Sequence, residues 1–386
     1  MEGIKMEFRD LNLQYKQNKQ AINDAIQSVL ESGQYIGGNP VIELEKQLAT
    51  YVGVKHCITC ANGTDALQLA LMAWGVGTGD AVFVPDFTFF ATAEVVPCVG
   101  ATPVFVDVEE DSFNISVKSL EMAIEKVLEE GNLTPKVVIA VDLFGQPADY
   151  LEIRKLTEKY GLLLLEDGAQ GFGGSINGNM ACSFGDISTT SFFPAKPLGC
   201  YGDGGAIFTD NDEWAELIKS YKVHGKGSDK YDNVRIGRNS RLDTIQAAVL
   251  LAKLDIFINE EIDAVNKVAD YYTNQLKNVV KIPCVKEGMR SSWAQYTICL
   301  KDKETRDALQ KSLKDERIPS MIYYIKPLHK QGAFCESVGD MVLPITEKLC
   351  DTVLSLPMHP YMKSDEIRKV CNVIEEFFAK RTRIVL

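Results

Sequence analysis

The chain has 386 residues, of which 46% are hydrophobic and 24% charged, the proportions of a globular protein that can bury one large core and a smaller one. Its net charge of −12 argues against a surface for nucleic acid or anionic lipid. No stretch approaches the roughly 20 apolar residues that span a bilayer, and residues 1–6 do not begin a signal peptide. We therefore expect a cytoplasmic protein without nucleic-acid or membrane partners.

Cysteine and histidine give no sign of a disulfide framework or a metal site. The ten cysteines follow no regular spacing, which suits a reducing compartment. Cys57 and Cys60 have CxxC spacing, but they lack a second pair and lie in a β-like run, so we expect core positions for both. The four histidines do not cluster, and no metal is expected.

Hydrophobic periodicity divides the first two thirds of the chain into alternating elements. Residues 19–32 and 40–51 carry apolar side chains at three- and four-residue spacing, which predicts helices. Short apolar runs predict strands over residues 56–60, 81–84, 102–105, 136–141, 162–165, 188–192 and 206–208, with helices near residues 64–74, 91–99, 117–129 and 151–160. This alternation predicts an α/β fold in which a mostly parallel sheet is covered by helices on both faces.

The last third of the chain predicts a second, smaller domain. Residues 225–233 form a polar, turn-rich stretch that suits a mobile or intersubunit loop. A long helical stretch over residues 244–277 leads to a strand over 294–300 and helices over 305–315 and 365–381, an α+β pattern. We therefore expect a large domain over residues 1–250 and a small domain over residues 251–386.

Lys196 is the most informative residue. Pro194 and Pro197 nearly bracket it, so it cannot lie inside a regular helix, and a glycine-rich turn follows. A lysine on a stiff turn among apolar and small residues is poorly solvated, which lowers its pKa toward the free amine. Such an amine can form a Schiff base with a carbonyl group. An ordinary surface lysine is the alternative interpretation of this segment.

Asp167 follows the leucine run over residues 162–165, which is typical of a buried central strand. Open α/β sheets bind ligands beyond the carboxyl ends of their strands, where Asp167 is expected. A buried carboxylate needs a cationic partner, and a protonated pyridinium nitrogen would supply one. Asp167 could instead be a helix cap.

Two further segments suit an anion. Gly63, Thr64 and Asp65 lie at the start of a predicted helix, where free backbone N–H groups can bind phosphate. Residues 238–243, with two arginines and an asparagine, precede the helix that begins near residue 244. Helix capping and a solvated loop are the respective alternatives. A lysine, a strand-end carboxylate and two anion sites together match the requirements of pyridoxal phosphate.

The chain resembles the DegT/DnrJ/EryC1/StrS family, sugar aminotransferases of fold type I that depend on pyridoxal phosphate. The resemblance covers nearly the whole chain, and its motifs lie at residues 32–37, 62–67, 85–92, 166–170, 191–196, 239–243 and 356–359. Residues 191–205 look most like those of bacterial enzymes that aminate a 3-keto sugar of a UDP-linked, acetamido-bearing uronic acid. The resemblance implies a seven-stranded sheet and a homodimer with two shared active sites.

The resemblance also implies roles for individual residues. Lys196 would form the Schiff base and shuttle protons, Asp167 would pair with the ring nitrogen, and Gln170 would contact the phenolic oxygen. The remaining cofactor contacts would be a ring-stacking Phe89, the phosphate ligands Gly63, Thr64, Asp65 and Ser191, and Asn239 from the neighbouring subunit. The implied substrate contacts are Arg241, Tyr323, Tyr324 and His329. Tyr323 stands where the family often has a histidine that helps to bind the sugar, which leaves the identity of the sugar open.

The function implied is transfer of an amino group from an amino acid, L-glutamate, to a nucleotide-linked keto sugar in amino-sugar and surface-polysaccharide biosynthesis. A dehydratase acting on a keto sugar with the same cofactor is one alternative, although relatives that dehydrate lack this lysine. A non-catalytic regulator that binds the cofactor is the other.

Overall fold

The computed structural model describes residues 6–229 and 231–385. Residues 1–5, where no signal peptide is expected, and Lys230, within the polar loop 225–233, lie outside the described residues.

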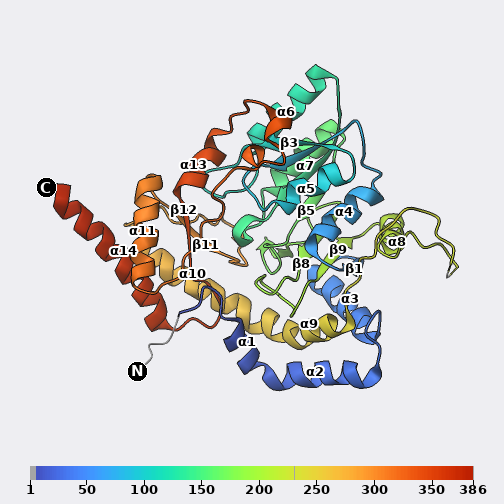
Figure 1. The fold of residues 1–386 in the computed structure, drawn as a ribbon, viewed down its shortest axis with the longest axis horizontal. Helices are drawn as coiled ribbons and strands as arrows, with labels where there is room; N and C mark the ends of the chain where they lie inside the picture. The colour runs from blue at the N-terminus through green and yellow to red at the C-terminus, as the bar shows by residue number, and fades with distance from the viewer. Residues whose placement is uncertain (1–5, 230, 386) are drawn as a thin grey trace.

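A seven-stranded sheet forms the centre of the larger part of the molecule, in the order β1-β9-β8-β5-β4-β2-β3 (Figure 1). β9 is antiparallel to both of its neighbours, and all other pairs are parallel. The predicted fold class is confirmed, and each predicted strand is present with its ends within two residues: β1 His56–Cys60, β2 Asp80–Pro85, β3 Thr102–Val106, β4 Thr134–Val141, β5 Leu163–Asp167, β8 Ile187–Ser191 and β9 Gly205–Thr209.

Helices cover both faces of this sheet because successive side chains of a strand point to opposite sides. In β2, Val82 and Val84 pack with α4 and α5, whereas Ala81 and Phe83 pack with α6 and α7. A third cluster joins α3 and α9 to β1 and β9. The covering helices are α3 Asn39–Val52, α4 Gly63–Ala73, α5 Ala91–Cys98, α6 Val117–Glu130, α7 Tyr150–Tyr160, α8 Asp212–Tyr221 and α9 Thr244–Ile256.

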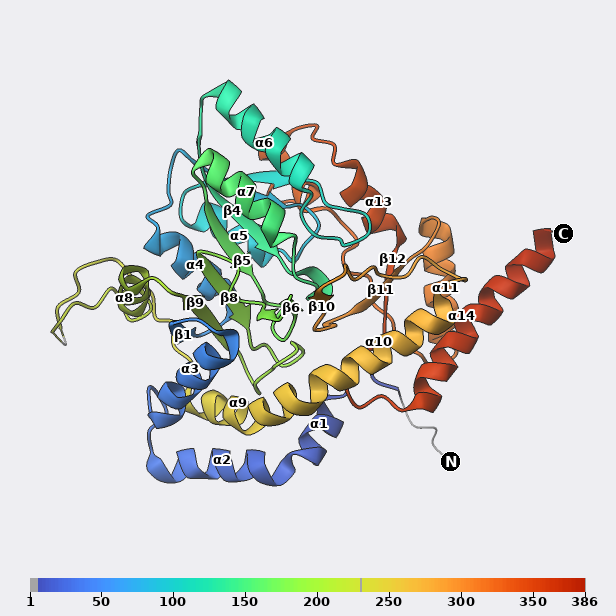
Figure 2. The same cartoon turned by 180° about the vertical axis from the view of Figure 1, so that it is seen from behind.

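A long helical rod runs from the sheet to the smaller part of the molecule (Figures 1 and 2). It consists of α9, one π-helical turn (Phe257–Glu261) and α10 (Ile262–Leu276). α2 lies beside α9 in both views. The predicted domain division between residues 250 and 251 falls inside α9, and it stays a prediction. Two helices precede the sheet, α1 Leu11–Gln17 and α2 Lys19–Ser32.

The smaller part has its own core. The antiparallel strands β11 and β12 pack with α10, α11 and α14, and Met6, from the start of the described chain, is buried among them. The elements are β11 Tyr296–Cys299, α11 Lys303–Asp315, α12 Cys335–Val338, α13 Pro344–Thr352, β12 Val353–Leu356 and α14 Ser364–Val385. Short elements that no sequence pattern predicted complete the fold: η1 Leu143–Gly145, β6 Ser175–Ile176, β7 Asn179–Met180, β10 Met289–Arg290 and η3 Leu328–Lys330.

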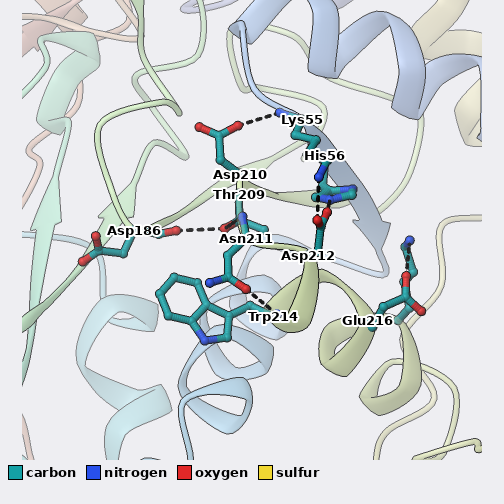
Figure 3. A network of polar contacts seen from close by, with 10 residues as sticks. Lys55, His56, Asp186, Thr209, Asp210, Asn211, Asp212, Trp214 and Glu216 are labelled. Atoms are coloured by element: carbon teal, nitrogen blue, oxygen red, sulfur yellow. Dashed lines mark hydrogen bonds and ion pairs between the residues drawn. The ribbon is translucent and has the colours of Figure 1, made fainter.

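Polar contacts at the start of α8 join the amino ends of β1 and β8 to the carboxyl end of β9 (Figure 3). Asp210 accepts a hydrogen bond of 2.7 Å from the backbone N–H of Lys55, which precedes β1. Thr209 donates to the carbonyl oxygen of Asp186 at 2.9 Å, and Asn211 caps α8. This edge is occupied by structural contacts, which leaves the opposite edge, at the carboxyl ends of the strands, for chemistry.

No helix in the described part of the chain is long and apolar enough to cross a membrane. Within residues 6–229 and 231–385, no group of three or more His, Cys, Asp or Glu side chains is placed to hold a metal ion.

Candidate active site

Asp167 lies at the carboxyl end of β5, the central strand of the sheet, and its side chain is buried. Thr92 Oγ1 donates to its Oδ2 at 2.8 Å, and the backbone N–H of Ala169 donates to its Oδ1 at 3.2 Å. Burial raises the pKa of Asp167, while these two donors and the charge of Lys196 lower it. The carboxylate is therefore fixed in orientation by neutral donors and has one neighbouring cation that counts electrostatically.

Lys196 lies in the segment 193–200, which we call the lysine turn. This turn follows β8, the strand beside β5, and is closed by a hydrogen bond of 2.8 Å from the Lys196 N–H to the Phe193 carbonyl. Burial lowers the pKa of the Lys196 amine, the charge of Asp167 opposes this shift, and the charge of Arg9 adds to it. The structure brings Lys196 and Asp167 together, and burial favours the neutral amine that a nucleophile needs.

The start of α4 lies against the end of β8. A Cβ atom on Gly63 would come within 2.8 Å of the Ser191 Cβ, so only glycine allows this approach. The N-cap Asn62 accepts from the backbone N–H of Asp65 at 2.7 Å. This disagrees with the predicted phosphate contact of the Asp65 amide, because the Asn62 side chain already uses that donor. The amides of Gly63 and Thr64 and the Ser191 hydroxyl remain the predicted phosphate ligands.

Gln170 is linked to the smaller part of the molecule. Its Oε1 accepts from the Phe144 N–H at 2.7 Å, and its Nε2 donates to the Tyr324 hydroxyl at 3.3 Å. Ser292 donates to the Gln170 carbonyl at 2.5 Å. Burial raises the pKa of Tyr324, which keeps this phenol neutral. Tyr324, predicted only as a substrate contact, therefore lies beside a predicted cofactor ligand.

Two aromatic side chains border this region. Phe89 is 54% exposed, so it is not the core phenylalanine of its segment; Phe87 is, at 1%. An exposed ring that follows β2 leaves a face free for a ligand, and the stacking role of Phe89 stays a prediction. Tyr323 is half-buried, and its ring centroid lies 6.3 Å from that of Phe8 and 5.7 Å from that of Tyr324.

The structure does not bring Asn239 and Arg241 to the site within one chain. Asn239 is exposed and Arg241 half-buried. Asn239 forms a backbone bridge with Val223, and no hydrogen bond or ion pair among the described residues joins either side chain to Lys196 or Asp167. The contact of Asn239 across a dimer and the contact of Arg241 with the substrate stay predictions.

His329 is buried, which disagrees with its predicted contact with the sugar. Its backbone N–H and its Nδ1 lie 2.7 and 2.6 Å from the two carboxylate oxygens of Asp86, and its Nε2 lies 3.6 Å from Glu347 Oε1. The pairing with a carboxylate explains how an imidazole is tolerated in the interior. His329 joins the smaller part to the end of β2.

Sequence reasoning missed Arg9, Thr92 and Asp86. Arg9 Nη2 donates to the carbonyl oxygens of Lys196 and Pro197 at 2.9 and 3.2 Å. Thr92 lies within the family motif at residues 85–92, and membership of that motif was the only sequence feature that pointed to it. Nothing in the sequence connects Arg9 with a turn 187 residues away.

Comparisons with known proteins agree with this geometry. Residues 16–375 match the DegT/DnrJ/EryC1/StrS aminotransferase family. The chain is 46% identical to UDP-2-acetamido-2-deoxy-3-oxo-D-glucuronate aminotransferase of Pseudomonas aeruginosa, over 95% of this chain and 98% of the relative. A family member from Brucella abortus has a solved structure with a TM-score of 0.94 and 52% identity, covering 97% of this chain and 99% of that one. NtdA from Bacillus subtilis, solved with bound cofactor PMP, has a TM-score of 0.89 and 28% identity, covering 98% and 86%.

The residues present fit pyridoxal phosphate. A buried carboxylate at a strand end can face a protonated ring nitrogen, and a desolvated amine close to it can bind an aldehyde. The close approach of Gly63 to Ser191 places a hydroxyl at the start of a helix, where phosphate is favoured. Sequence, fold and site agree that the chain belongs to the DegT/DnrJ/EryC1/StrS aminotransferase family, enzymes of fold type I whose cofactor is pyridoxal phosphate.

Proposed function

We propose that this aminotransferase moves an amino group from L-glutamate to the keto carbon of a nucleotide-linked sugar, in the biosynthesis of amino sugars for surface polysaccharides. The observation that carries the proposal is the pair of the half-buried Lys196 and the buried Asp167 at the carboxyl edge of the sheet, where each influences the pKa of the other. The Pseudomonas relative, which acts on a UDP-linked 3-oxo-glucuronate by its name, supports a substrate of the same class.

The chain's own residues divide the work between them. The bound cofactor would supply an electron sink for the carbanion that forms next to the transferred nitrogen. Asp167, kept in place by Thr92, holds the charge that keeps the ring nitrogen protonated. In each half of the reaction the Lys196 amine would move a proton between the substrate carbon and the bound cofactor, away from the donor's carbon in the first half and onto the former keto carbon of the sugar in the second. Gln170, oriented by Phe144, presents its amide to the phenolic oxygen.

The active unit we propose is a homodimer with shared sites. Asn239 and Arg241 would reach the phosphate and the substrate of the partner subunit. Val234 and Ile236, which directly follow the polar loop 225–233, support this arrangement because they are exposed, Ile236 by 92%. Apolar side chains this exposed in one chain would be buried by a second copy.

The test begins with reduction of the holoenzyme by borohydride, followed by peptide mapping. We expect the cofactor label on Lys196, and a label on another lysine would contradict the assignment. Lys196→Ala should keep some cofactor through the phosphate contacts and lose transamination.

A turnover assay distinguishes an aminotransferase from the two alternatives, a dehydratase and a non-catalytic regulator. The loaded protein is mixed with L-glutamate and then with UDP-linked and dTDP-linked keto sugars, and the amino-sugar product is measured by mass spectrometry. Amination of one of these sugars supports the proposal. Loss of the sugar hydroxyl without amination would indicate a dehydratase, and cofactor binding with no turnover on any sugar would indicate a regulator.

A further inference from the structure

Two cations donate to backbone carbonyls of the lysine turn. Arg9 Nη2 contacts the carbonyl oxygens of Lys196 and Pro197 at 2.9 and 3.2 Å. Lys253 Nζ donates to the carbonyl oxygen of Gly199. Three carbonyl groups within four residues are therefore held by positively charged side chains, and hydrogen bonds from charged donors are about twice as strong as neutral ones.

Neither cation belongs to the turn or to the strands beside it. Arg9 precedes α1, in the segment that connects Met6 in the smaller core to the N-terminal helices. Lys253 lies on α9 with only 3% of its surface exposed, and its ammonium group lies 5.3 Å from the centroid of the Tyr201 ring. Burying a charged lysine this deeply costs folding free energy unless the ammonium group has hydrogen-bond acceptors or opposite charges beside it.

One carboxylate balances the two cations in part. The charge of Glu261, in the π-helical turn, interacts with both Arg9 and Lys253. Glu261 is buried and accepts hydrogen bonds from Gln14 Nε2 at 3.0 Å and from the Tyr361 hydroxyl. Single π-turns inside α-helices are frequent at functional sites. Here the turn provides a counter-charge that interacts with Arg9 and Lys253.

We propose that Arg9 and Lys253 are positioning residues, which hold the lysine turn by its carbonyl oxygens and so fix the Lys196 amine relative to Asp167. This inference rests on the proposed role of Lys196. Residues 6–9 also contact the smaller part: Met6 is buried in its core, and the Phe8 carbonyl accepts a hydrogen bond from the Met358 N–H. Arg9 therefore links the placement of the smaller part to that of the reactive amine.

One of the two cations, Arg9, also affects the protonation of Lys196. Two charged groups influence its amine: Asp167 raises its pKa, and Arg9 lowers it together with burial. A cation on the backbone side of the turn thus favours the neutral amine without occupying the site where a ligand would bind.

The test uses the full chain without cofactor and compares Arg9→Met and Lys253→Met, which keep an unbranched apolar side chain and remove the charge, with Arg368→Met. Arg368 is an exposed arginine on α14 and serves as the matched control. Hydrogen exchange is measured on peptides that span residues 193–200. The pKa of the Lys196 amine is measured by competitive acetylation over a range of pH, with detection by mass spectrometry.

Arg9→Met should speed exchange in residues 193–200 by about tenfold or more, as expected for the loss of charge-assisted hydrogen bonds. It should also raise the pKa of Lys196, because removing a nearby positive charge favours the protonated amine. Lys253→Met should speed exchange with a smaller effect on the amine. Arg9→Lys keeps the positive charge. In this variant the pKa of Lys196 should lie closer to the wild-type value than the exchange rate of residues 193–200 does.

If exchange and the Lys196 pKa in both methionine variants match those of Arg368→Met, the proposal is overturned. Should a methionine variant fail to fold, Arg9→Lys and Lys253→Arg give the same two readouts in a chain that keeps its charges. Failure of the proposed function gives a different result, because borohydride would then label a lysine other than Lys196 whatever the state of the turn.

Discussion

At the scale of single residues, the role proposed for Asp167 requires a negatively charged side chain. Asp167→Asn keeps the shape and the Thr92 contact, but an amide cannot hold the ring nitrogen protonated. We expect turnover to fall by about 10²–10⁴-fold, the range of a lost acid–base contribution, with little change in melting temperature. Thr92→Val, the control for orientation alone, should cost far less. Near-normal turnover in Asp167→Asn would show that Asp167 is only a structural cap.

His359 is a buried group whose effect is on stability. Burial lowers its pKa from 6.5 to about 4, and the charge of Arg9 acts in the same direction. Between these values the unfolded chain binds more protons than the folded one, so stability is lost as pH falls from about 6.5 to 4. The loss should amount to about 3 kcal/mol.

Urea unfolding between pH 4 and pH 7 measures this dependence in the wild-type chain and in His359→Gln. Subtracting the pH dependence of the variant from that of the wild-type chain leaves the contribution of His359 alone. The variant should lose the part of the pH slope that falls between pH 4 and 6.5, and equal slopes in the two proteins would refute the assignment.

Single residues also show where sequence reasoning reached its limit. Asp167 was predictable because a run of leucines ends at it and strand ends bind ligands. The burial of His329 was not, because its partner Asp86 lies 243 residues away and a sequence does not show which charges meet. Arg9 escaped notice for the same reason. The capping of the Asp65 amide by Asn62 is local, and helix capping was the alternative interpretation of this segment.

At the scale of elements, the seven strands were predictable because each is a short apolar run between polar segments, and their ends shifted by no more than two residues. β6, β7 and β10 have two residues each, too few for any periodicity. The π-helical turn, Phe257–Glu261, interrupts an otherwise continuous helical pattern and has no composition of its own.

The approach of α4 to β8 gives a prediction for an element. Gly63→Ala would place a Cβ atom 2.8 Å from the Ser191 Cβ, so the start of the helix must move away from the strand. Overpacking of this kind costs about 1–3 kcal/mol, and we expect cofactor affinity to fall by about tenfold or more. Gly77→Ala is the matched control, because its Cβ would meet only the Val99 carbonyl at 3.7 Å.

Cofactor binding to both alanine variants can be followed by fluorescence titration of the unloaded proteins. Equal affinities in Gly63→Ala and Gly77→Ala would mean that the start of α4 does not hold the phosphate.

At the scale of the whole molecule, the placement of Asn239 outside the site of its own chain leads to a prediction about subunits. Lys196→Ala and Asn239→Asp should each be inactive, the second because a carboxylate repels the phosphate. After subunit exchange about half of the dimers are mixed, and each mixed dimer has one sound site, so about a quarter of wild-type activity should return. No recovery despite proven exchange, or an active monomer in sedimentation, would contradict shared sites.

The position of β1 at the edge of the sheet has a consequence for synthesis on the ribosome. Within the described part of the chain its one strand partner is β9, whose residues pair with it from Cys60↔Gly205 to His56↔Thr209. At about 5–20 residues per second, β1 waits roughly 7–30 s for that partner. During this interval its apolar edge is open to other chains. Nascent chains stalled before residue 205 should therefore be cut by protease near β1, and chains stalled well beyond residue 209 should resist; equal cleavage of the two would show that β1 is protected by other means.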